Sequence, residues 1–361
     1  MSLRDRLTAQ IASGGPISVA QYMTACLHDP DFGYYATRPA IGEAGDFITA
    51  PMISQMFGEM IGVWAASAWE LMGRPDELRL VEMGPGDGTL MSDVLKTVRH
   101  AEGFLEAADV WLVETSPPLR ALQAERLGEV VSWAASLAEV PDGAPTILIA
   151  NELLDCLPVR QFVRTSIGWA EQVVGLDAEG ELTFGLANTP AAGLLPDAQP
   201  GQVFEQSAAQ AALGAELGAR LAADGGAALL IDYGRSGPDF GDTLQALRRH
   251  EKVDPLYNPG EADLTVHADF PAVMAAARAE GCGTAILTQT QFLARMGIGE
   301  RAEALVRSAP ARSAVIGRQL TRLIAADEMG ELFKVCAIHS DDWTPPAFEE
   351  EPAFEREADE A

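Results

Sequence analysis

The chain has 361 residues, 48% of them hydrophobic, and a formal net charge of −28 at pH 7. This length suits one large domain with additions or two domains, and this hydrophobic share suits a sizeable buried core. So strong an acidic excess repels phosphate backbones, which argues against a nucleic acid partner, whereas a substrate that carries arginine or lysine would be attracted.

The first 75 residues predict a helical N-terminal extension. Ser18 suits the N-cap of a short helix over Val19–His28, and a polar, glycine-rich link over residues 29–50 follows it. From about Met52 to Met72, apolar residues recur every three or four positions, which predicts one long amphipathic helix. The periodicity leaves open whether this helix buries its apolar face inside the chain or forms a homodimer contact.

An α/β pattern begins at Leu78, where short apolar runs alternate with helical stretches. The runs that we predict as strands in this first stretch are 78–83, 110–113, 130–133 and 146–150. Helices are predicted between them at 89–100 and 117–127. Alternation of this kind predicts a parallel, doubly wound, Rossmann-like sheet.

The rhythm changes at about 157–204, where short segments separated by Gly and Asp predict antiparallel hairpins inserted into the α/β domain. The α/β pattern then resumes, interrupted by an irregular stretch over 234–266 that is a candidate lid. Its predicted elements are a helix at 205–223, a strand at 227–231, a helix near 270–280, a strand near 284–288, two helices between 290 and 326 and a strand at 332–339. We therefore expect one domain over 76–340 and, because prolines and acids crowd the end of the chain, a disordered acidic tail over 341–361.

The four cysteines, Cys26, Cys156, Cys282 and Cys336, lie too far apart in the sequence to form a metal-binding motif. We expect unpaired thiols in a reducing compartment and no metal site. The N-terminus lacks the apolar segment of a secretory signal, and no run of about 18 uncharged apolar residues occurs. These features predict a soluble, intracellular chain without a membrane span.

The sharpest motif is Val81-Glu82-Met83-Gly84-Pro85-Gly86-Asp87-Gly88-Thr89, between a predicted strand and a predicted helix. Its glycines allow a sharp turn and close approach of a ligand. The spacing G-x-G-x-G differs from the G-x-G-x-x-G of dinucleotide sites, and Asp87 would repel a pyrophosphate. S-adenosylmethionine has no phosphate, and Glu82 can face its ammonium group. The motif therefore favours S-adenosylmethionine as cofactor, with a dehydrogenase as the alternative.

An acid follows the next predicted strand, in Trp111-Leu112-Val113-Glu114. A carboxylate at this place can accept hydrogen bonds from both ribose hydroxyls of a nucleoside. The alternative is a solvated side chain at the end of a strand. Together with the glycine loop, Glu114 predicts a nucleoside site.

Polar residues also follow the fourth predicted strand, in Asn151-Glu152-Leu153-Leu154-Asp155. The carboxyl ends of parallel strands are where open α/β sheets bind ligands, so we expect Asn151, Glu152 and Asp155 to be catalytic. If a helix turn starts there, the two carboxylates share one face and can clamp a guanidinium. The alternative is that Asn151 or Asp155 caps a helix.

Three further side chains are weaker candidates. Asp46, in Gly45-Asp46-Phe47, can contact the cofactor or can cap a turn. Tyr233 follows the fifth strand of the α/β pattern and can line the substrate pocket or simply pack. His267 can bind substrate and accept a proton, although a lone histidine is more often structural.

Together these motifs resemble the MidA-like methyltransferases, a family with a mitochondrial branch that dimethylates an arginine of a respiratory complex I subunit. The resemblance covers about residues 15–340. The matching pieces are 45–51, 53–55, 57–59, 84–90, 114–117, 150–155, 157–159, 231–234, 263–270 and 288–297.

The resemblance implies a class I methyltransferase fold, with a seven-stranded sheet whose last strand is antiparallel and a helical extension that covers the active site. It carries cofactor binding onto Gly84, Gly86 and Gly88 and ribose binding onto Glu114. Pro85, Thr115 and Ser116 join the cofactor site because they belong to the same motifs.

The resemblance also implies a protein arginine methyltransferase acting on a complex I subunit, in the cytoplasm of a bacterium or in the mitochondrial matrix of a eukaryote. Two alternatives remain open. One is a methyltransferase that acts on a small molecule. The other is a non-catalytic assembly factor that binds S-adenosylmethionine.

Overall fold

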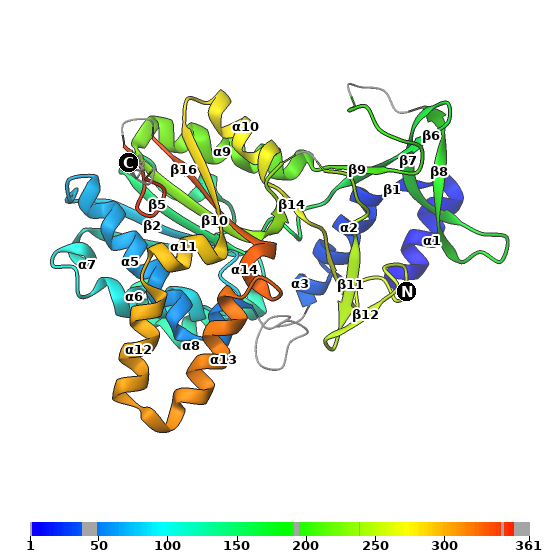
Figure 1. Ribbon diagram of the computed structural model, residues 1–361. Coiled ribbons are helices and arrows are strands. Elements are labelled where there is room, and N and C mark those ends of the chain that lie inside the picture. Colours follow the sequence, from blue (N-terminus) through cyan, green and yellow to red (C-terminus); the bar gives the residue numbers. More distant parts are fainter. Residues whose placement is uncertain (1, 38–48, 191–194, 238, 341–342, 350–361) are drawn as a thin grey trace, which may run out of the picture.

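The computed structural model describes residues 2–37, 49–190, 195–237, 239–340 and 343–349. Figure 1 shows a large α/β part and, beside it, a smaller part in which the N-terminal helices α1 and α2 lie against antiparallel strands. The helices α12 and α13 project from the α/β part as an arm (Figure 1).

The main sheet has a path of seven strands. In spatial order they are β15 (Gly283–Thr288), β16 (Phe333–His339), β10 (Gly226–Arg235), β5 (Thr146–Asn151), β2 (Leu78–Met83), β3 (Ala108–Val113) and β4 (Ser132–Ala134). An eighth, short strand, β14 (Ala268–Asp269), pairs with the end of β10. Only β16, the last strand in the chain, runs antiparallel to its neighbours. The expected seven-stranded sheet with an antiparallel last strand is confirmed.

The central strands are buried on both faces, as parallel strands in a doubly wound sheet must be. In β5, Ile147 and Ile149 face one apolar core, and Leu148 and Ala150 face another. The first core is covered by α5 (Gln55–Leu71) and α6 (Thr89–Val98). The second core is covered by α9 (Ala208–Asp224) and α10 (Phe270–Ala279). The other α-helices between β2 and β4 are α7 (Phe104–Ala107) and α8 (Pro117–Leu127).

The N-terminal extension is helical, as predicted, but its long helix is broken. It contains α1 (Leu3–Gly14), α2 (Val19–His28), α3 (Tyr34–Thr37) and α4 (Ala50–Ile53) before α5. Ser18 caps α2 as expected, and its hydroxyl accepts a 3.1 Å hydrogen bond from Gln21 N.

Ser54 interrupts the helix that we predicted over Met52–Met72. Its backbone is extended, at φ −160° and ψ 135°, and its hydroxyl accepts a 3.2 Å hydrogen bond from Met56 N, so it caps α5 instead of continuing α4. The apolar face of α5, including Phe57 and Trp64, is buried in the chain's own core. This apolar face is therefore not available for a homodimer contact, which was the alternative that the periodicity left open.

The inserted hairpins form a second sheet. Its antiparallel strands are β1 (Ile17–Ser18), β6 (Arg160–Thr165), β7 (Gly168–Leu176), β8 (Leu182–Pro190) and β9 (Val203–Gln206). Apolar residues of α1 and α2, such as Leu7 and Tyr22, share one core with Val174 of β7. The extension and the insertion, distant in sequence, therefore pack as one unit (Figure 1).

The stretch over 234–266 is more regular than predicted. It contains a three-stranded antiparallel sheet of β11 (Gln245–Arg248), β12 (Glu251–Val253) and β13 (Asp263–Thr265). The pairing between β11 and β13 joins residues far apart in the chain, for example Ala246 with Leu264. Short strands without alternation give no local signal, so the sequence pattern missed them.

The C-terminal region carries more helices than the two predicted. They are α11 (Gln289–Arg295), α12 (Ile298–Ser308), α13 (Ser313–Ile324) and α14 (Met329–Leu332). Within the described ranges, no helix has the length and apolar character needed to cross a membrane.

The predicted disordered tail was wrong for residues 343–349. Ala347 and Phe348 are buried against the main core, where Phe348 lies 6.0 Å from Phe292 between ring centroids. Arg295 donates a 2.8 Å hydrogen bond to Ala347 O. Apolar burial therefore outweighs the polar composition of this stretch. Residues 350–361 lie outside the described residues.

Candidate active site

The glycine loop between β2 and α6 bends tightly through three left-handed backbone conformations. The φ angles of Gly84, Gly86 and Gly88 are +66°, +54° and +80°. A side chain is disfavoured at such angles, and a Cβ added at Gly84 would also lie 3.0 Å from Leu153 Cδ1. The loop therefore needs glycine at these three positions, where it presents backbone, not side chains, to whatever lies beside it.

Asp87 has a structural role within this loop. Its carboxylate accepts a 3.0 Å hydrogen bond from Thr89 N at the start of α6, and it forms a 2.8 Å ion pair with Arg126. Anions at a helix N-terminus are stabilised by the free N–H groups there. Asp87 thus occupies the place where a dinucleotide pyrophosphate would bind, which agrees with the prediction from the sequence.

Glu82, at the end of β2, fits a cationic ligand group. It is only 2% exposed, and its Oε2 atom has no hydrogen-bond partner among the described residues. Burial, reinforced by the charge of Asp87, raises the pKa of its carboxyl to about 8. An ammonium group beside it would satisfy the unpaired oxygen and favour the ionised form.

Glu114 lies next to the glycine loop, directly after β3. Gln123 of α8 is fully buried and joins the two, because its amide donates a 2.7 Å hydrogen bond to Gly86 O and a 3.4 Å one to Glu114 Oε2. The other carboxylate oxygen accepts a 2.7 Å hydrogen bond from Ser116 N. Burial raises the pKa of Glu114. The loop and the acid therefore lie on the same side of the sheet.

The neighbours of Glu114 differ in their surroundings. Ser116 is buried, and its Oγ atom has no hydrogen-bond partner in the part of the chain that the structure describes. Thr115 is exposed. Pro85 lines the cleft described next, and its carbonyl accepts a 2.8 Å hydrogen bond from Gly88 N, which closes the turn.

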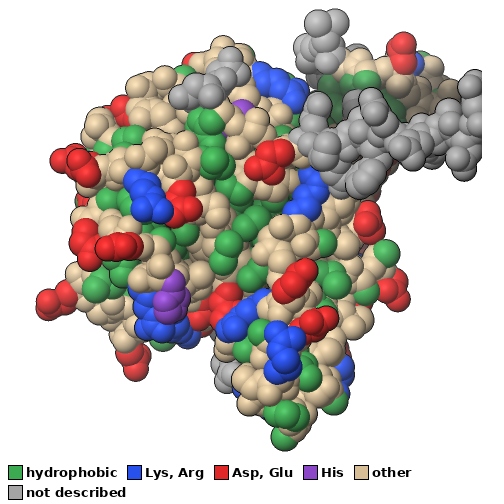
Figure 2. Space-filling model, turned by 60° about the vertical axis from the view of Figure 1, so that its left-hand side comes forward, with side chains coloured by type: hydrophobic (Ala, Val, Ile, Leu, Met, Phe, Trp, Pro, Cys, Tyr) green, Lys and Arg blue, Asp and Glu red, His purple; other side chains and the backbone are tan. Residues whose placement is uncertain are grey.

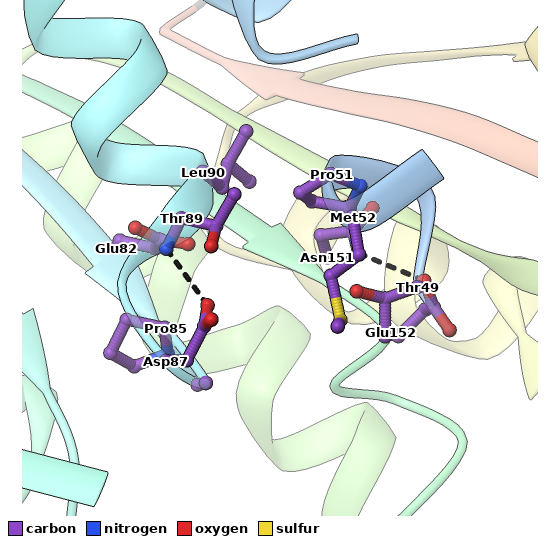
Figure 3. A pocket seen from close by; sticks show the side chains of 12 residues that line it. Thr49, Pro51, Met52, Glu82, Pro85, Asp87, Thr89, Leu90, Asn151 and Glu152 are labelled. Carbon is purple, nitrogen blue, oxygen red and sulfur yellow. Dashed lines mark hydrogen bonds between the residues drawn. The ribbon is translucent and has the colours of Figure 1, made fainter. Parts of the chain in front are cut away.

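A cleft of about 400 Å³ lies between the glycine loop and the carboxyl end of β5. Figure 3 shows Glu82, Pro85 and Asp87 on one side and Asn151, Glu152, Thr49 and Met52 on the other. The residues that line it are Thr49, Pro51, Met52, Glu82, Gly84, Pro85, Gly86, Asp87, Thr89, Leu90, Asn151 and Glu152. Glu114 is not among them and reaches the loop through Gln123.

The N-terminal extension supplies one wall of this cleft. Thr49, Pro51 and Met52 come from α4 and the residue before it. Sequence reasoning did not single them out, although Thr49 and Pro51 stand in one of the motifs shared with the MidA-like family. Asp46, predicted to contact the cofactor, lies outside the described residues.

Glu152 faces the cleft from a strained backbone position. Its φ angle is +53°, a left-handed value that is costly for a residue with a Cβ and that clusters at functional sites. Its Oε1 accepts hydrogen bonds from Asn151 Nδ2 (3.1 Å, dashed in Figure 3) and from Ala50 N (3.3 Å). Burial, together with the charge of Asp155, raises the pKa of Glu152 to about 8. Asn151 Oδ1 is buried and unpaired within the described ranges.

The sequence analysis placed Glu152 and Asp155 on one face of a helix, provided that a helix turn started there. No helix forms at these residues, and the two acids do not share a face. Residues 152–155 form turns, and Asp232 holds them there by accepting hydrogen bonds from Leu154 N (2.9 Å) and Asp155 N (3.1 Å). Asp155 is 5% exposed and does not line the cleft. Burial raises the pKa of Asp155 to about 6 and that of Asp232 well above its usual range.

Tyr233 and His267 lie behind this buried acid pair. The Tyr233 hydroxyl donates a 2.7 Å hydrogen bond to Asp155 Oδ2. The His267 ring packs edge-on against the Tyr233 ring, with centroids 5.7 Å apart, and burial lowers the pKa of His267. Neither side chain lines the cleft.

Two residues that organise the site were missed from the sequence. Asp232 stands in the Ile231-Asp232-Tyr233-Gly234 motif, so a signal was present there. Gln123 carried no signal, because a polar residue in a surface helix gives no indication that it will be buried.

Comparison with known proteins agrees with this geometry. Residues 60–288 match a family model described as "Putative S-adenosyl-L-methionine-dependent methyltransferase". The mitochondrial protein arginine methyltransferase NDUFAF7 of Danio rerio is 36% identical, with 93% of this chain and 86% of that protein covered. The human protein of the same name is 35% identical, with 92% and 82% covered.

A solved structure from Burkholderia thailandensis, bound to S-adenosyl-homocysteine, has the same fold. Its TM-score is 0.83 at 29% sequence identity, with 96% of this chain and 94% of that chain covered. The family model, the fold and the glycine loop agree on S-adenosylmethionine as the cofactor and on methyl transfer as the reaction. The chain therefore belongs to the MidA-like family of S-adenosyl-L-methionine-dependent methyltransferases.

Proposed function

We propose that the chain is a protein arginine N-methyltransferase whose substrate guanidinium binds beside Asn151 and Glu152. One observation carries this proposal: the half-buried carboxylate of Glu152, on a left-handed backbone, faces the glycine loop across the cleft. The relatives that are about a third identical over most of the chain, and are named protein arginine methyltransferases, support the same substrate class.

We assign the cofactor contacts to the residues around the loop. Gly84, Gly86 and Gly88 would hold the backbone of the loop against the ligand, and Glu82 would face its ammonium group. Glu114 would accept hydrogen bonds from the ribose hydroxyls, with Pro85, Thr115 and Ser116 beside it. The bound cofactor supplies a methyl group on a positively charged sulfur.

Glu152 would orient the acceptor. An arginine side chain stays protonated at any ordinary pH, with a pKa above about 12. An ionised Glu152 would accept hydrogen bonds from two nitrogens of the substrate guanidinium. It would draw the positive charge toward these two nitrogens and leave the third nitrogen more nucleophilic. As the new nitrogen–carbon bond forms and the sulfur–methyl bond breaks, the third nitrogen would release its proton to solvent, and Asn151 would help to hold the guanidinium in line.

Asp155, Tyr233 and His267 take supporting roles in this proposal. Burial and the charge of Asp155 disfavour the ionised form of Glu152 until a cation binds. A guanidinium in the cleft would reverse this effect. Tyr233 holds Asp155 in place, and His267 packs behind Tyr233.

For the substrate we propose a subunit of respiratory complex I, as the family resemblance implies. The chain would act in the cytoplasm of a bacterium or, in a eukaryote, in the mitochondrial matrix. The names of the relatives call them mitochondrial. We also propose the division into an extension over 1–75 and a methyltransferase domain over 76–340, with an insertion around 157–204.

Mass spectrometry of respiratory subunits from cells with and without the gene tests the substrate. We expect dimethylated arginine that disappears when the gene is deleted and returns with the wild-type gene. A Glu152→Gln gene should fail to restore it, whereas Glu125→Gln, a change on the exposed face of α8, should restore it. Transfer of labelled methyl groups to small molecules alone would contradict the proposal.

A further inference from the structure

A second, larger hollow adjoins the cleft. It has about 1260 Å³ of space, part of it open solvent, and lies between α4 and α13. Met52 lines both this groove and the cleft, so the two adjoin at this residue. Gln319 of α13 donates a 2.7 Å hydrogen bond to Ile53 O, which fixes the spacing of the two walls.

One face of α13 forms the outer wall of this groove. Ala314, Gly317, Arg318, Thr321 and Arg322 recur three or four positions apart, so they share that face. A groove that is open at the surface, runs along a helix and adjoins the cleft of Glu152 suits a stretch of polypeptide better than a small molecule.

Two arginines in this wall have no acidic partner in the described part of the chain. Arg318 and Arg322 are exposed and have no ion-pair or hydrogen-bond partner among the described residues. Other arginines, such as Arg301 with Glu59 and Arg235 with Asp269, are paired with acids. Acidic side chains are scattered over the face drawn in Figure 2, and many basic ones lie beside them.

Arg322 and Met52 line the same groove, and Met52 also lines the cleft beside Glu152. In keeping with this placement, the positive charge of Arg322 lowers the pKa of Glu152, against the larger and opposite effect of burial. Glu328 is the one acid among the described residues that line the groove. The groove therefore offers two unpaired cations close to the proposed position of the substrate arginine.

Gly317 keeps this wall low. A Cβ built there would meet nothing within 4 Å, and its φ angle is not left-handed, so neither packing nor backbone conformation requires glycine. Glycine inside a helix costs about 1 kcal/mol relative to alanine. The lack of a side chain at Gly317 therefore has one structural effect, which is to leave the groove open at this point.

We propose that this groove holds the substrate polypeptide next to its methylated arginine, and that Arg318 and Arg322 select an aspartate or glutamate there. This inference rests on the proposed arginine methyltransferase function. Carboxylates bind arginine side chains through paired, charge-assisted hydrogen bonds. The substrate would thus present an arginine to Glu152 and an acid to α13.

Synthetic peptides test this selection. Each peptide carries one arginine and one aspartate, with the aspartate placed in turn at every offset on either side, and a matched peptide carries asparagine instead. Methyl transfer from labelled S-adenosylmethionine gives kcat and KM. At one or a few neighbouring offsets we expect the aspartate peptide to have a KM about fivefold lower than its asparagine partner.

Two sets of variants separate charge from space. The charge reversal Arg318→Glu with Arg322→Glu should abolish the preference for aspartate and create one for lysine at the same offset. The matched control reverses Arg99 and Arg278, which are also exposed but do not line the groove, and should leave the preference intact. Gly317→Leu should raise the KM of every peptide while leaving cofactor affinity unchanged, because it fills the groove but not the cleft.

The outcomes distinguish this inference from the proposed function. If the peptides are methylated with equal KM for aspartate and asparagine at every offset, the selection by Arg318 and Arg322 is wrong and the arginine methyltransferase stands. The same holds if the charge reversal keeps the preference for aspartate. If no peptide accepts label from an enzyme that binds S-adenosylmethionine, both proposals fail together.

Discussion

The Tyr233 hydroxyl donates a 2.7 Å hydrogen bond to Asp155 Oδ2, and neither of these two residues lines the cleft. The two acids that follow β5, Glu152 and Asp155, therefore have different surroundings. Glu152 faces the cleft, whereas Asp155 is held in the interior and acts on the cleft only through its charge. This difference leads to different expectations for the two acids and their neighbours.

Tyr233→Phe removes the hydrogen bond and keeps the ring. The bond lowers the pKa of Asp155, so its loss should raise that pKa further above the usual range. A single hydrogen bond is worth about 1 kcal/mol, so we expect kcat to fall about fivefold with little change in KM. A protonated Asp155 no longer opposes the ionisation of Glu152, so the rise of kcat/KM with pH should move to lower pH, which a purely structural role would not produce.

The control for this change is Tyr257→Phe, because Tyr257 is exposed and distant from the cleft residues in sequence. It should leave both kcat and the pH profile unchanged. A Tyr233→Phe enzyme with the wild-type profile would show that Asp155 does not influence the reaction.

Glu152→Gln keeps the shape of the side chain but removes its charge. Without the carboxylate, the guanidinium charge is no longer drawn to one side, and we expect kcat to fall by on the order of 100-fold or more. The affinity for S-adenosylmethionine, measured by calorimetry, should change little, because the proposed cofactor contacts lie on the other side of the cleft. Unchanged turnover would remove Glu152 from the mechanism.

The pH dependence of the rate follows from the same carboxyl. With a pKa of about 8 in the free enzyme, Glu152 is protonated at neutral pH and ionises as the pH rises. The proposed role needs the ionised form, so kcat/KM for the peptide should rise with pH through about 8 and then level off. Measuring at saturating cofactor separates this step from Glu82, whose pKa is also about 8. A flat profile in wild type, or a rise retained in Glu152→Gln, would contradict the assignment.

Gly86→Val tests the glycine loop. Its φ angle of +54° is unfavourable for valine, and the added side chain would project at the cofactor site, so we expect no measurable binding of S-adenosylmethionine. Gly143→Val is the matched control, since Gly143 is also left-handed at φ +86° but has open space around it. Both variants should lose similar thermal stability, and only the first should lose the cofactor. Full binding by Gly86→Val would show that the loop does not hold the cofactor.

The parts of the fold that could be predicted from the sequence are those in which a local pattern reports burial. Residues 147–150 are apolar without interruption because β5 is buried on both faces, and Ser18 caps α2 through a bond to Gln21, three residues away. The glycine loop was recognisable for the same reason. Its three left-handed angles lie within five residues and leave few alternatives to glycine.

The features that the sequence did not reveal depend on contacts between distant residues. The break at Ser54 is fixed partly by Gln319, which bonds to Ile53 from α13. The turn that removes Asp155 from the face of Glu152 is held by Asp232, whose strand lies far along the chain. The link between the loop and Glu114 depends on burial of Gln123. No pattern within a few residues of these positions carries that information.

The most direct test of the account is a crystal structure of the protein with S-adenosylhomocysteine. We expect the ribose hydroxyls to contact the carboxylate of Glu114 and the ammonium group to lie near Glu82. The nucleoside should lie over residues 84–88, with the sulfur of the ligand turned toward Glu152. A ligand bound elsewhere, or one whose ribose makes no contact with Glu114, would contradict it.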